Sequence, residues 1–224
     1  MRNRIGTGIG RAWFAAAVVV LLVSTTPARA DGKIELPAAD AATVRKAGPR
    51  GGASASAYFN IEGKNNGDDG SYASFGVVEF RAEKPAKPVA KVKGLKLLLT
   101  QSIARFSKDG PIKVALLTDA KAPDLSEGSP LKFDAAKPGG VGEQLGSTVP
   151  LGGIEFSKAE TGKVDAVVLI LNDASEAHIC AQINAGGAIR LVVTPANDEV
   201  AATYFGPKPK DPSQRPALSV ETGE

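Results

Sequence analysis

Residues 58–80 read YFNIEGKNNGDDGSYASFGVVEF and contain two apolar runs separated by a turn-forming cluster. In the first run, residues 58–62, apolar and polar side chains alternate, which is the pattern of a strand with one buried face. The second run, residues 72–80, is rich in aromatic and β-branched residues, which favour strands. Between them, residues 63–70 are glycine, asparagine, aspartate and lysine, and the first three accept the positive φ of hairpin loops. This stretch predicts a β-hairpin.

Similar short apolar runs, broken by glycine, proline, asparagine and aspartate, continue to the end of the chain. We predict strands over residues 94–103, 112–118, 154–156, 164–171, 189–194, 201–204 and 217–220. A tight turn at residues 107–111 joins two of them, 94–103 and 112–118, into a second expected hairpin. The run 164–171 (VDAVVLIL) is almost wholly apolar, so we expect a strand buried on both faces.

Two connecting segments are less regular. Residues 84–91 contain Pro85 and Pro88, which exclude a central strand and predict an extended connector. Residues 119–152 are broken repeatedly by proline and glycine. A loop of this length in a compact domain is functional or contains short strands, for which residues 131–133 and 147–149 are the candidates.

One helix is predicted, over residues 175–184, with Asp173 or Ser175 as its N-terminal cap and Gly186 just past its end. Nine to eleven strands with one short helix near 175–184, and no alternation of strands with helices, predict an all-β fold. We expect a two-sheet antiparallel jelly-roll sandwich. The sandwich is placed in one domain over residues 43–222, preceded by a lead-in segment at residues 31–42.

The first thirty residues have the three parts of a secretory signal peptide. Arg2, Arg4 and Arg11 form a basic head, residues 12–23 are apolar, and Ala28-Arg29-Ala30 is a small-x-small cleavage sequence. An apolar run of this length is too short to span a bilayer, so no membrane span is expected. We therefore predict export to the periplasm or the extracellular space, with cleavage after Ala30.

Removal of this signal changes the charge of the protein. Four of the 27 basic residues and none of the 24 acidic residues lie in residues 1–30, which leaves 23 basic and 24 acidic groups and a net charge of −1. A nucleic-acid partner is excluded, because that binding requires clustered cations. Cys180 is the only cysteine, so no intramolecular disulfide can form. Its thiol is either buried and inert or exposed and able to form intermolecular bridges.

Three segments of the sequence form a recognisable set. They are Ala42-Thr43-Val44-Arg45 with Gly51-Gly52, Asn60 to Gly63 and Ser74 to Phe80; Gly186 to Thr194 with Val200 to Gly206; and Arg215-Pro216-Ala217-Leu218-Ser219-Val220. Together they resemble exported bacterial β-sandwich domains of the DNRLRE type, which are similar to the family 96 carbohydrate-binding modules. The resemblance spans about residues 42–220. It implies a jelly roll whose final strand is the Pro-x-Leu-x-Val ending, and sugar binding as its most common function.

Candidate ligand-binding residues follow from the chemistry of sugars. Tyr58 and Tyr204 lie near glycine-rich strand ends, where a ring could face solvent and stack on a sugar. Arg45, Arg50 and Arg190 could pair with the carboxylates of acidic sugars, since a guanidinium binds a carboxylate through two hydrogen bonds. For each of these residues, a place in the core or a salt bridge at a strand edge is the alternative.

Calcium is the one cofactor that the sequence leaves open. Asn65, Asn66, Asp68 and Asp69 supply four oxygen-bearing side chains in a glycine-flanked loop, and calcium requires such oxygen ligands. A bare hairpin loop is the alternative. A second, looser acidic cluster lies in the irregular segment and consists of Asp119, Asp124, Glu127 and Asp134.

Catalytic chemistry has less support. His178 is the only histidine, so a Ser-His-Asp or Cys-His apparatus would have to include it. A zinc site needs several histidine or cysteine ligands and is excluded. We therefore expect a monomeric, non-catalytic exported module that binds an extracellular polysaccharide or an envelope component. The alternatives are a structural or protein-interaction module of the envelope and, third, a polysaccharide-degrading enzyme such as a lyase that uses a tyrosine and a basic residue.

Overall fold

The computed structural model describes residues 32–52, 55–65, 72–119 and 121–223. The expected signal peptide, residues 1–30, and three of the expected calcium ligands, Asn66, Asp68 and Asp69, lie outside these residues. Within them, no helix has the length and apolar character needed to cross a membrane.

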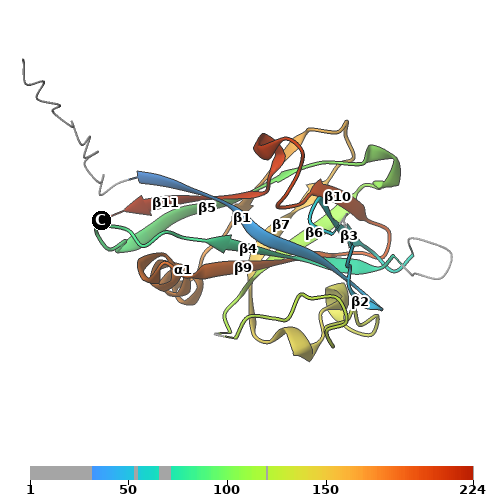
Figure 1. The fold of residues 1–224 in the computed structure, drawn as a ribbon, viewed down its shortest axis with the longest axis horizontal. Coiled ribbons are helices and arrows are strands. Elements are labelled where there is room, and N and C mark those ends of the chain that lie inside the picture. Colours follow the sequence, from blue (N-terminus) through green and yellow to red (C-terminus); the bar gives the residue numbers. More distant parts are fainter. Residues whose placement is uncertain (1–31, 53–54, 66–71, 120, 224) are drawn as a thin grey trace, which may run out of the picture.

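Antiparallel β-strands dominate the described residues (Figure 1), which confirms the prediction of an all-β fold with one short helix. The strands are β1 (Gly32–Arg45), β2 (Gly48–Pro49), β3 (Tyr58–Glu62), β4 (Ser74–Arg81), β5 (Lys91–Thr100), β6 (Gly110–Leu117), β7 (Thr148–Phe156), β8 (Val164–Leu169), β9 (Ala188–Pro195), β10 (Ala201–Phe205) and β11 (Ala217–Gly223). The helices are α1 (Asp173–Ala185) and four 3₁₀ turns, η1 (Ala104–Phe106), η2 (Pro138–Gly140), η3 (Glu143–Leu145) and η4 (Pro212–Gln214).

The eight longest strands follow one path in the order β7-β6-β9-β4-β1-β11-β5-β8. Their pairing is nested: the first of the eight pairs with the last (β1 with β11), the second with the seventh (β4 with β9), the third with the sixth (β5 with β8), and the fourth with the fifth (β6 with β7). This order is that of a jelly roll. The backbone N–H of Ile170 donates to the carbonyl of Leu151 at 2.8 Å, so the two ends of the path meet and the structure is barrel-like.

The first strand, β1, belongs to both halves of the sandwich. Residues 32–37 pair with β11, and residues 38–45 pair with β4, with a bulge between Ala38 and Asp40. The lead-in segment predicted for residues 31–42 is therefore corrected, because residues 32–42 form most of this strand. Leu36 and Ala38 face the core between exposed neighbours, and the single Pro37 is tolerated where the strand changes partner.

The predicted hairpin of β3 and β4 exists only at its loop end, and the predicted hairpin of β5 and β6 is wrong, although each strand exists. β3 and β4 pair only at Glu62 and Ser74, and the main partner of β3 is β10. β5 pairs with β8 and β11, whereas β6 pairs with β7 and β9. β5 and β6 lie in opposite halves of the sandwich, because these consecutive strands of the jelly roll cross between the halves. β3 and β4 lie in the same half, where β3 pairs along its length with β10.

Strand β8 was expected to be buried on both faces, and this is wrong as well. Val167 and Leu169 are buried, but Val164 and Val168 are 53% and 60% exposed. β8 is the last strand of the path and lies at the edge of its half-sheet. One face of it therefore packs on the core and the other faces solvent.

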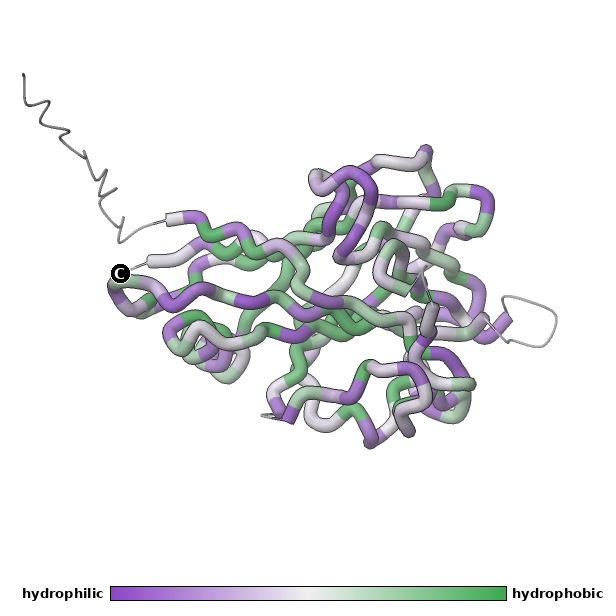
Figure 2. The backbone as a smooth tube through the Cα atoms, viewed as in Figure 1, coloured by the Kyte–Doolittle hydropathy of each residue, from purple (hydrophilic) through white to green (hydrophobic). Residues whose placement is uncertain are grey.

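The main core lies between the two halves of the sandwich, and Figure 2 shows hydrophobic positions gathered along the central strands. A second, smaller cluster forms where the irregular segment after β6 covers the other face of β4 and β9. Leu131, Phe133 and Leu145 from that segment pack there on Phe75 and Val77. Of the two short strands proposed in this segment, 147–149 is the beginning of β7, and 131–133 makes only an isolated bridge between Phe133 and Val141.

Helix α1 begins after Asn172, whose side chain accepts a hydrogen bond from the backbone N–H of Ser175 at 2.9 Å. The Ser175 hydroxyl accepts in return from the Asn172 N–H, which completes a capping box. Asn172 is thus the cap in place of Asp173 or Ser175. Gly186 ends the helix with a left-handed φ of 67°, as predicted. Ile179 and Ile183 attach the helix to the main core.

Candidate functional site

A cavity of about 670 Å³ opens at the end of the molecule formed by β2, β3 and β10, away from helix α1 (Figure 1). β3 supplies one wall of it with Tyr58, Asn60 and Glu62. The ends of β1 and β4 and the loop after β2 supply Thr43, Arg45, Ser74 and Arg50, and the segment from η1 to β6 supplies residues 103 and 105–108. Tyr72, Ala201 and Thr203 complete the lining.

The alternation of β3 produces this arrangement. Phe59 and Ile61 are fully buried in the main core, so the intervening residues 58, 60 and 62 face the cavity. The Phe59 ring lies so close to Gly76 of β4 that a Cβ there would be 2.7 Å from it. The glycine thus lets β3 approach β4 closely. β10 adds Ala201 and Thr203 on the cavity side, opposite Glu62 and Asn60.

Asn60 is the centre of a hydrogen-bond network on the cavity wall. Its side-chain oxygen accepts from Arg50 Nη1 at 2.9 Å, and its Nδ2 donates to Glu62 Oε1 at 3.3 Å and Thr203 Oγ1 at 3.1 Å. Its backbone N–H donates to Thr43 Oγ1 at 2.9 Å. Every polar group of the Asn60 side chain is engaged, so the network fixes the groups around it.

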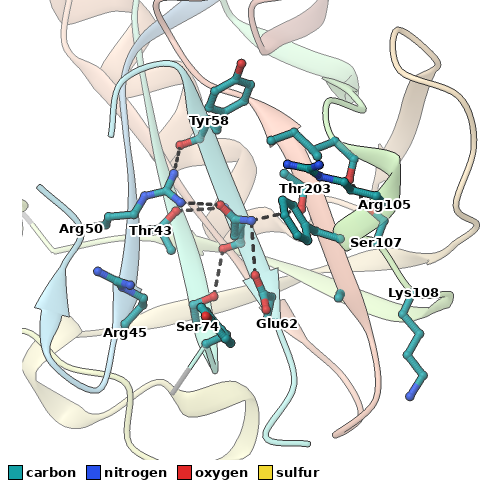
Figure 3. Close-up of a pocket in the computed structure, with 15 residues that line it drawn as sticks. Thr43, Arg45, Arg50, Tyr58, Glu62, Ser74, Arg105, Ser107, Lys108 and Thr203 are labelled. Atoms are coloured by element: carbon teal, nitrogen blue, oxygen red, sulfur yellow. Dashed lines mark hydrogen bonds between the residues drawn. The ribbon is translucent and has the colours of Figure 1, made fainter. Parts of the chain in front are cut away.

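Arg45 and Arg50 lie on the same side of this network (Figure 3). Arg50 donates through Nη2 to the carbonyl of Tyr58 at 2.6 Å and through Nη1 to Asn60, and both acceptors are uncharged. The Nε atoms of Arg45 and Arg50 are buried and lack hydrogen-bond partners, and within the described residues neither guanidinium forms an ion pair. Burial, together with the charge of Arg45, lowers the pKa of Arg50. The cavity wall thus holds two cations whose charge is not neutralised by an ion pair.

Glu62 is the one carboxylate among the described residues that line the cavity. Burial raises the pKa of Glu62 to about 7, although its hydrogen bond from Asn60 and the charges of Arg50 and Arg45 act in the opposite direction. Desolvation of the charged form therefore outweighs the attraction of the two guanidinium groups. At neutral pH the Glu62 carboxyl group is close to half protonated.

The rest of the cavity lining includes two exposed rings and two further basic side chains. Phe106 and Tyr72 are each 57% exposed, which is unusual for large rings. The Arg105 guanidinium lies over the Phe106 ring, with 4.6 Å between its central carbon and the ring centroid. Lys108 pairs with Glu199 at the rim. Figure 3 shows Arg105 across the cavity from Arg45 and Arg50, with Glu62 between them.

Three of the five predicted ligand-binding residues lie at the cavity, and two do not. Arg45, Arg50 and Tyr58 line the cavity together. The Tyr58 ring is half-buried and lies against Phe205, with 5.8 Å between ring centroids. Their part in ligand binding stays a prediction.

Tyr204 and Arg190 are corrected. The Tyr204 side chain is fully buried against Phe59 and Phe156, because it falls on the core side of β10, and it cannot stack on a sugar. Arg190 on β9 donates from Nε to Glu79 Oε2 at 2.8 Å and its side chain is only 17% exposed. Arg190 therefore forms a cross-strand salt bridge with Glu79, which was the alternative to its role in ligand binding.

The acidic clusters bring no ligands together in the part of the chain that the structure describes, where no group of three or more potential metal-ligating residues occurs. Asn65 Nδ2 donates to Glu199 Oε1 at 3.0 Å, and the other three residues of the proposed calcium set lie outside the described residues. Asp124 accepts from Ser126, and Asp134 accepts from the Ala136 N–H, as in ordinary turns. Calcium binding by residues 65–69 stays a prediction, which a calorimetric titration of calcium tests.

His178 and Cys180 lie on α1, outside the cavity lining. Burial and the charge of Arg190 lower the pKa of His178. Burial, followed by the charge of Glu176, raises the pKa of Cys180, which disfavours its reactive thiolate form. Neither residue meets the groups of the cavity.

Several cavity residues were not predicted, notably Asn60, Glu62, Tyr72, Arg105 and Phe106. For Asn60 and Glu62 a signal existed, because both alternate with buried apolar residues in a strand that was correctly predicted. Arg105 and Phe106 follow β5 in a short 3₁₀ turn, and no sequence pattern places that turn beside β3.

The chain was compared with known proteins, and neither a family model nor a curated protein matches it.

Proposed function

We propose that this protein is a non-catalytic, exported β-sandwich module that binds an anionic extracellular polysaccharide in the cavity beside β3. One observation carries the proposal. Arg45 and Arg50, which have no ion-pair partner among the described residues, line a cavity whose lining also includes the exposed rings of Tyr72 and Phe106. Guanidinium groups bind carboxylate or sulfate, and aromatic faces bind the apolar face of a sugar ring.

The volume of the cavity supports the binding of an oligosaccharide segment within it more than the binding of a polymer on a flat surface. A volume of about 670 Å³ lies within the range of small-molecule sites and accommodates a few sugar units. A bound sugar would stack one ring face on an exposed aromatic ring and direct its charged substituent toward Arg45.

Retention of the protein by polysaccharides tests the proposal. Affinity electrophoresis against polygalacturonate, dextran sulfate and neutral dextran is expected to show retardation by the charged polymers and none by dextran. Arg45→Gln should weaken binding by at least about tenfold, since a charge-assisted hydrogen bond contributes about 1.5–3 kcal/mol. Arg81→Gln is the matched control, because the Arg81 side chain is 72% exposed and outside the cavity. Lack of retardation by every charged polymer, or equal retardation of Arg45→Gln and the native protein, would refute the proposal.

A second candidate function, protein interaction in the envelope, is favoured by the outward face of β8. Val164, Val168 and the adjacent Ile170 are 53%, 60% and 74% exposed in one row at a sheet edge. An edge strand with apolar side chains can pair with a strand of another protein. Val168→Lys should abolish such an association, and light scattering of the protein mixed with its envelope partner would detect the loss.

A polysaccharide-degrading enzyme is the third candidate. Hydrolysis of a glycosidic bond ordinarily requires two carboxylates, and Glu62 alone lines the described cavity. The pKa of Glu62, about 7, does suit proton transfer. Incubation with polygalacturonate should release no reducing ends or unsaturated products if the module only binds.

A further inference from the structure

Glu62 and Arg50 are connected through a single side chain. Asn60 donates to the Glu62 carboxylate at 3.3 Å and accepts from Arg50 at 2.9 Å. Glu62 thus lies on the same wall of the cavity as the cations that the proposed function assigns to the ligand. It pairs across the sheet with Ala201 of β10 and Ser74 of β4, neither of which is charged.

The charged and titratable groups that face the cavity come from every element around it. β1 supplies Arg45, the loop after β2 supplies Arg50, and β3 supplies Tyr58 and Glu62. Tyr72 comes from just before β4, and Arg105 and Lys108 come from the segment between β5 and β6. Lys108 is paired with Glu199. Glu62 is the one carboxyl group of this described set, and burial raises its pKa to about 7.

We infer that the cavity takes up one proton at Glu62 when it captures an anionic group. The inference rests on the proposed function and describes how pH regulates ligand binding at the same cavity. An anion held by Arg45 and Arg50 places a second negative charge beside a half-buried carboxylate. Like charges at short range favour the protonated form of a carboxyl group, so binding and protonation support each other.

The size of the coupling follows from the linkage between protonation and binding. Burial raises the pKa of Glu62 to about 7 in the free protein. If the bound form holds the proton throughout, the apparent dissociation constant is set by the fraction of free protein that is already protonated. That fraction falls by about tenfold between pH 6 and pH 8, so affinity should fall by about tenfold over the same range.

Isothermal titration calorimetry with trigalacturonate at pH 6, 7 and 8 tests this inference. The carboxylates of the probe remain ionised throughout, so they contribute no pH dependence. Repeating the titration at pH 7.5 in buffers of different ionisation enthalpy measures the number of protons taken up, with an expected value between about one half and one. This measurement uses the native protein and does not depend on any variant folding.

Two substitutions assign the proton to its residue. Glu62→Gln mimics the protonated form, so it should bind trigalacturonate at pH 8 about as tightly as the native protein does at pH 6, with no pH dependence. Glu155→Gln is the matched control, because Glu155 is exposed on β7 and outside the cavity. It should retain the full pH dependence.

The outcomes separate the inference from the proposed function. Tight binding with equal affinity at pH 6 and pH 8, or without proton uptake, overturns the inference and leaves the proposed function standing. Retention of the native pH dependence by Glu62→Gln also overturns it, because His178 or another group would then carry the proton. If trigalacturonate and the charged polymers fail to bind at any of these pH values, both fail together.

Discussion

The phenolic hydroxyl of Tyr204 on β10 donates a hydrogen bond to Asp165 Oδ2 on β8 at 3.1 Å, and both side chains are buried. Burial, reinforced by the Asp165 charge, raises the pKa of Tyr204 far above its ordinary value, so the hydroxyl remains a neutral donor. Asp165 Oδ2 also accepts from Gln101 Nε2 at 2.8 Å, and Lys163 lies 3.5 Å from Oδ1. A buried carboxylate is thus satisfied by groups from three separate segments.

Tyr204→Phe should lower the free energy of unfolding by about 1–2 kcal/mol, because it removes one donor from a buried carboxylate. The ring contacts with Phe59 and Phe156 would be kept. Urea denaturation measures the change, and polysaccharide retention should stay at its native value because the side chain does not line the cavity. Tyr72→Phe, on an exposed ring, is the stability control. An unchanged unfolding free energy for Tyr204→Phe would contradict this role of the hydroxyl.

Glu62→Gln should stabilise the protein at pH 8 and have little effect at pH 5. The pKa of Glu62 is raised from 4.5 to about 7 on folding, so the folded state holds its proton more tightly than the unfolded state does. The native protein therefore loses stability as pH rises from about 4.5 through 7, and the glutamine variant does not. The difference at pH 8 should be on the order of 3 kcal/mol by urea denaturation. Equal stability of the two proteins at pH 8 would show that Glu62 has an ordinary pKa.

Asn172→Ala should destabilise the protein by about 1 kcal/mol, because it removes the acceptor for the Ser175 N–H at the start of α1. Thermal unfolding followed by circular dichroism measures this loss as a lower melting temperature. Asn172→Asp keeps a capping oxygen and should stay near native stability. A similar loss in both variants would mean that the cap is not the cause.

Phe133→Ala should cost about 3 kcal/mol of unfolding free energy, since the Phe133 ring is 5% exposed in the second cluster. It should also speed tryptic cleavage after Lys132, because the irregular segment loses its anchor on β4 and β9. Phe106→Ala is the matched control for stability, as that ring is 57% exposed. Native rates of cleavage in Phe133→Ala would show that other contacts hold the segment.

Strand identity could be predicted from the sequence because it depends on local alternation. β3 was predicted with the correct ends, and the core of each of β4, β5, β6, β8, β9, β10 and β11 was found. The pairing of these strands could not be predicted, because it joins distant segments such as residues 58–62 and 201–205. β1 was missed in part, because its bulge and Pro37 interrupt the alternation on which the prediction depends.

Only some of the residues that line the cavity were predicted from the sequence. Arg45, Arg50 and Tyr58 were selected for their chemistry, and the fold brings them together. Tyr204 was selected on the same grounds and is buried, since the face of β10 that meets the core follows from its pairing with β3. The shifted pKa of Glu62 depends on how deeply neighbouring strands bury it, which a one-dimensional pattern does not contain.

The position of β11 has a consequence for the order of assembly during synthesis. It lies between β1 and β5, so residues 32–37 of the first strand find their partner only when residues 217–223 have emerged. Until then the half-sheet is divided, and the edges of β1 and β5 are open. Contacts this distant along the chain slow folding. The domain should therefore acquire its cooperative structure only after residues 217–223 have left the ribosome, and a nonsense codon before residue 217 should leave an aggregation-prone remnant.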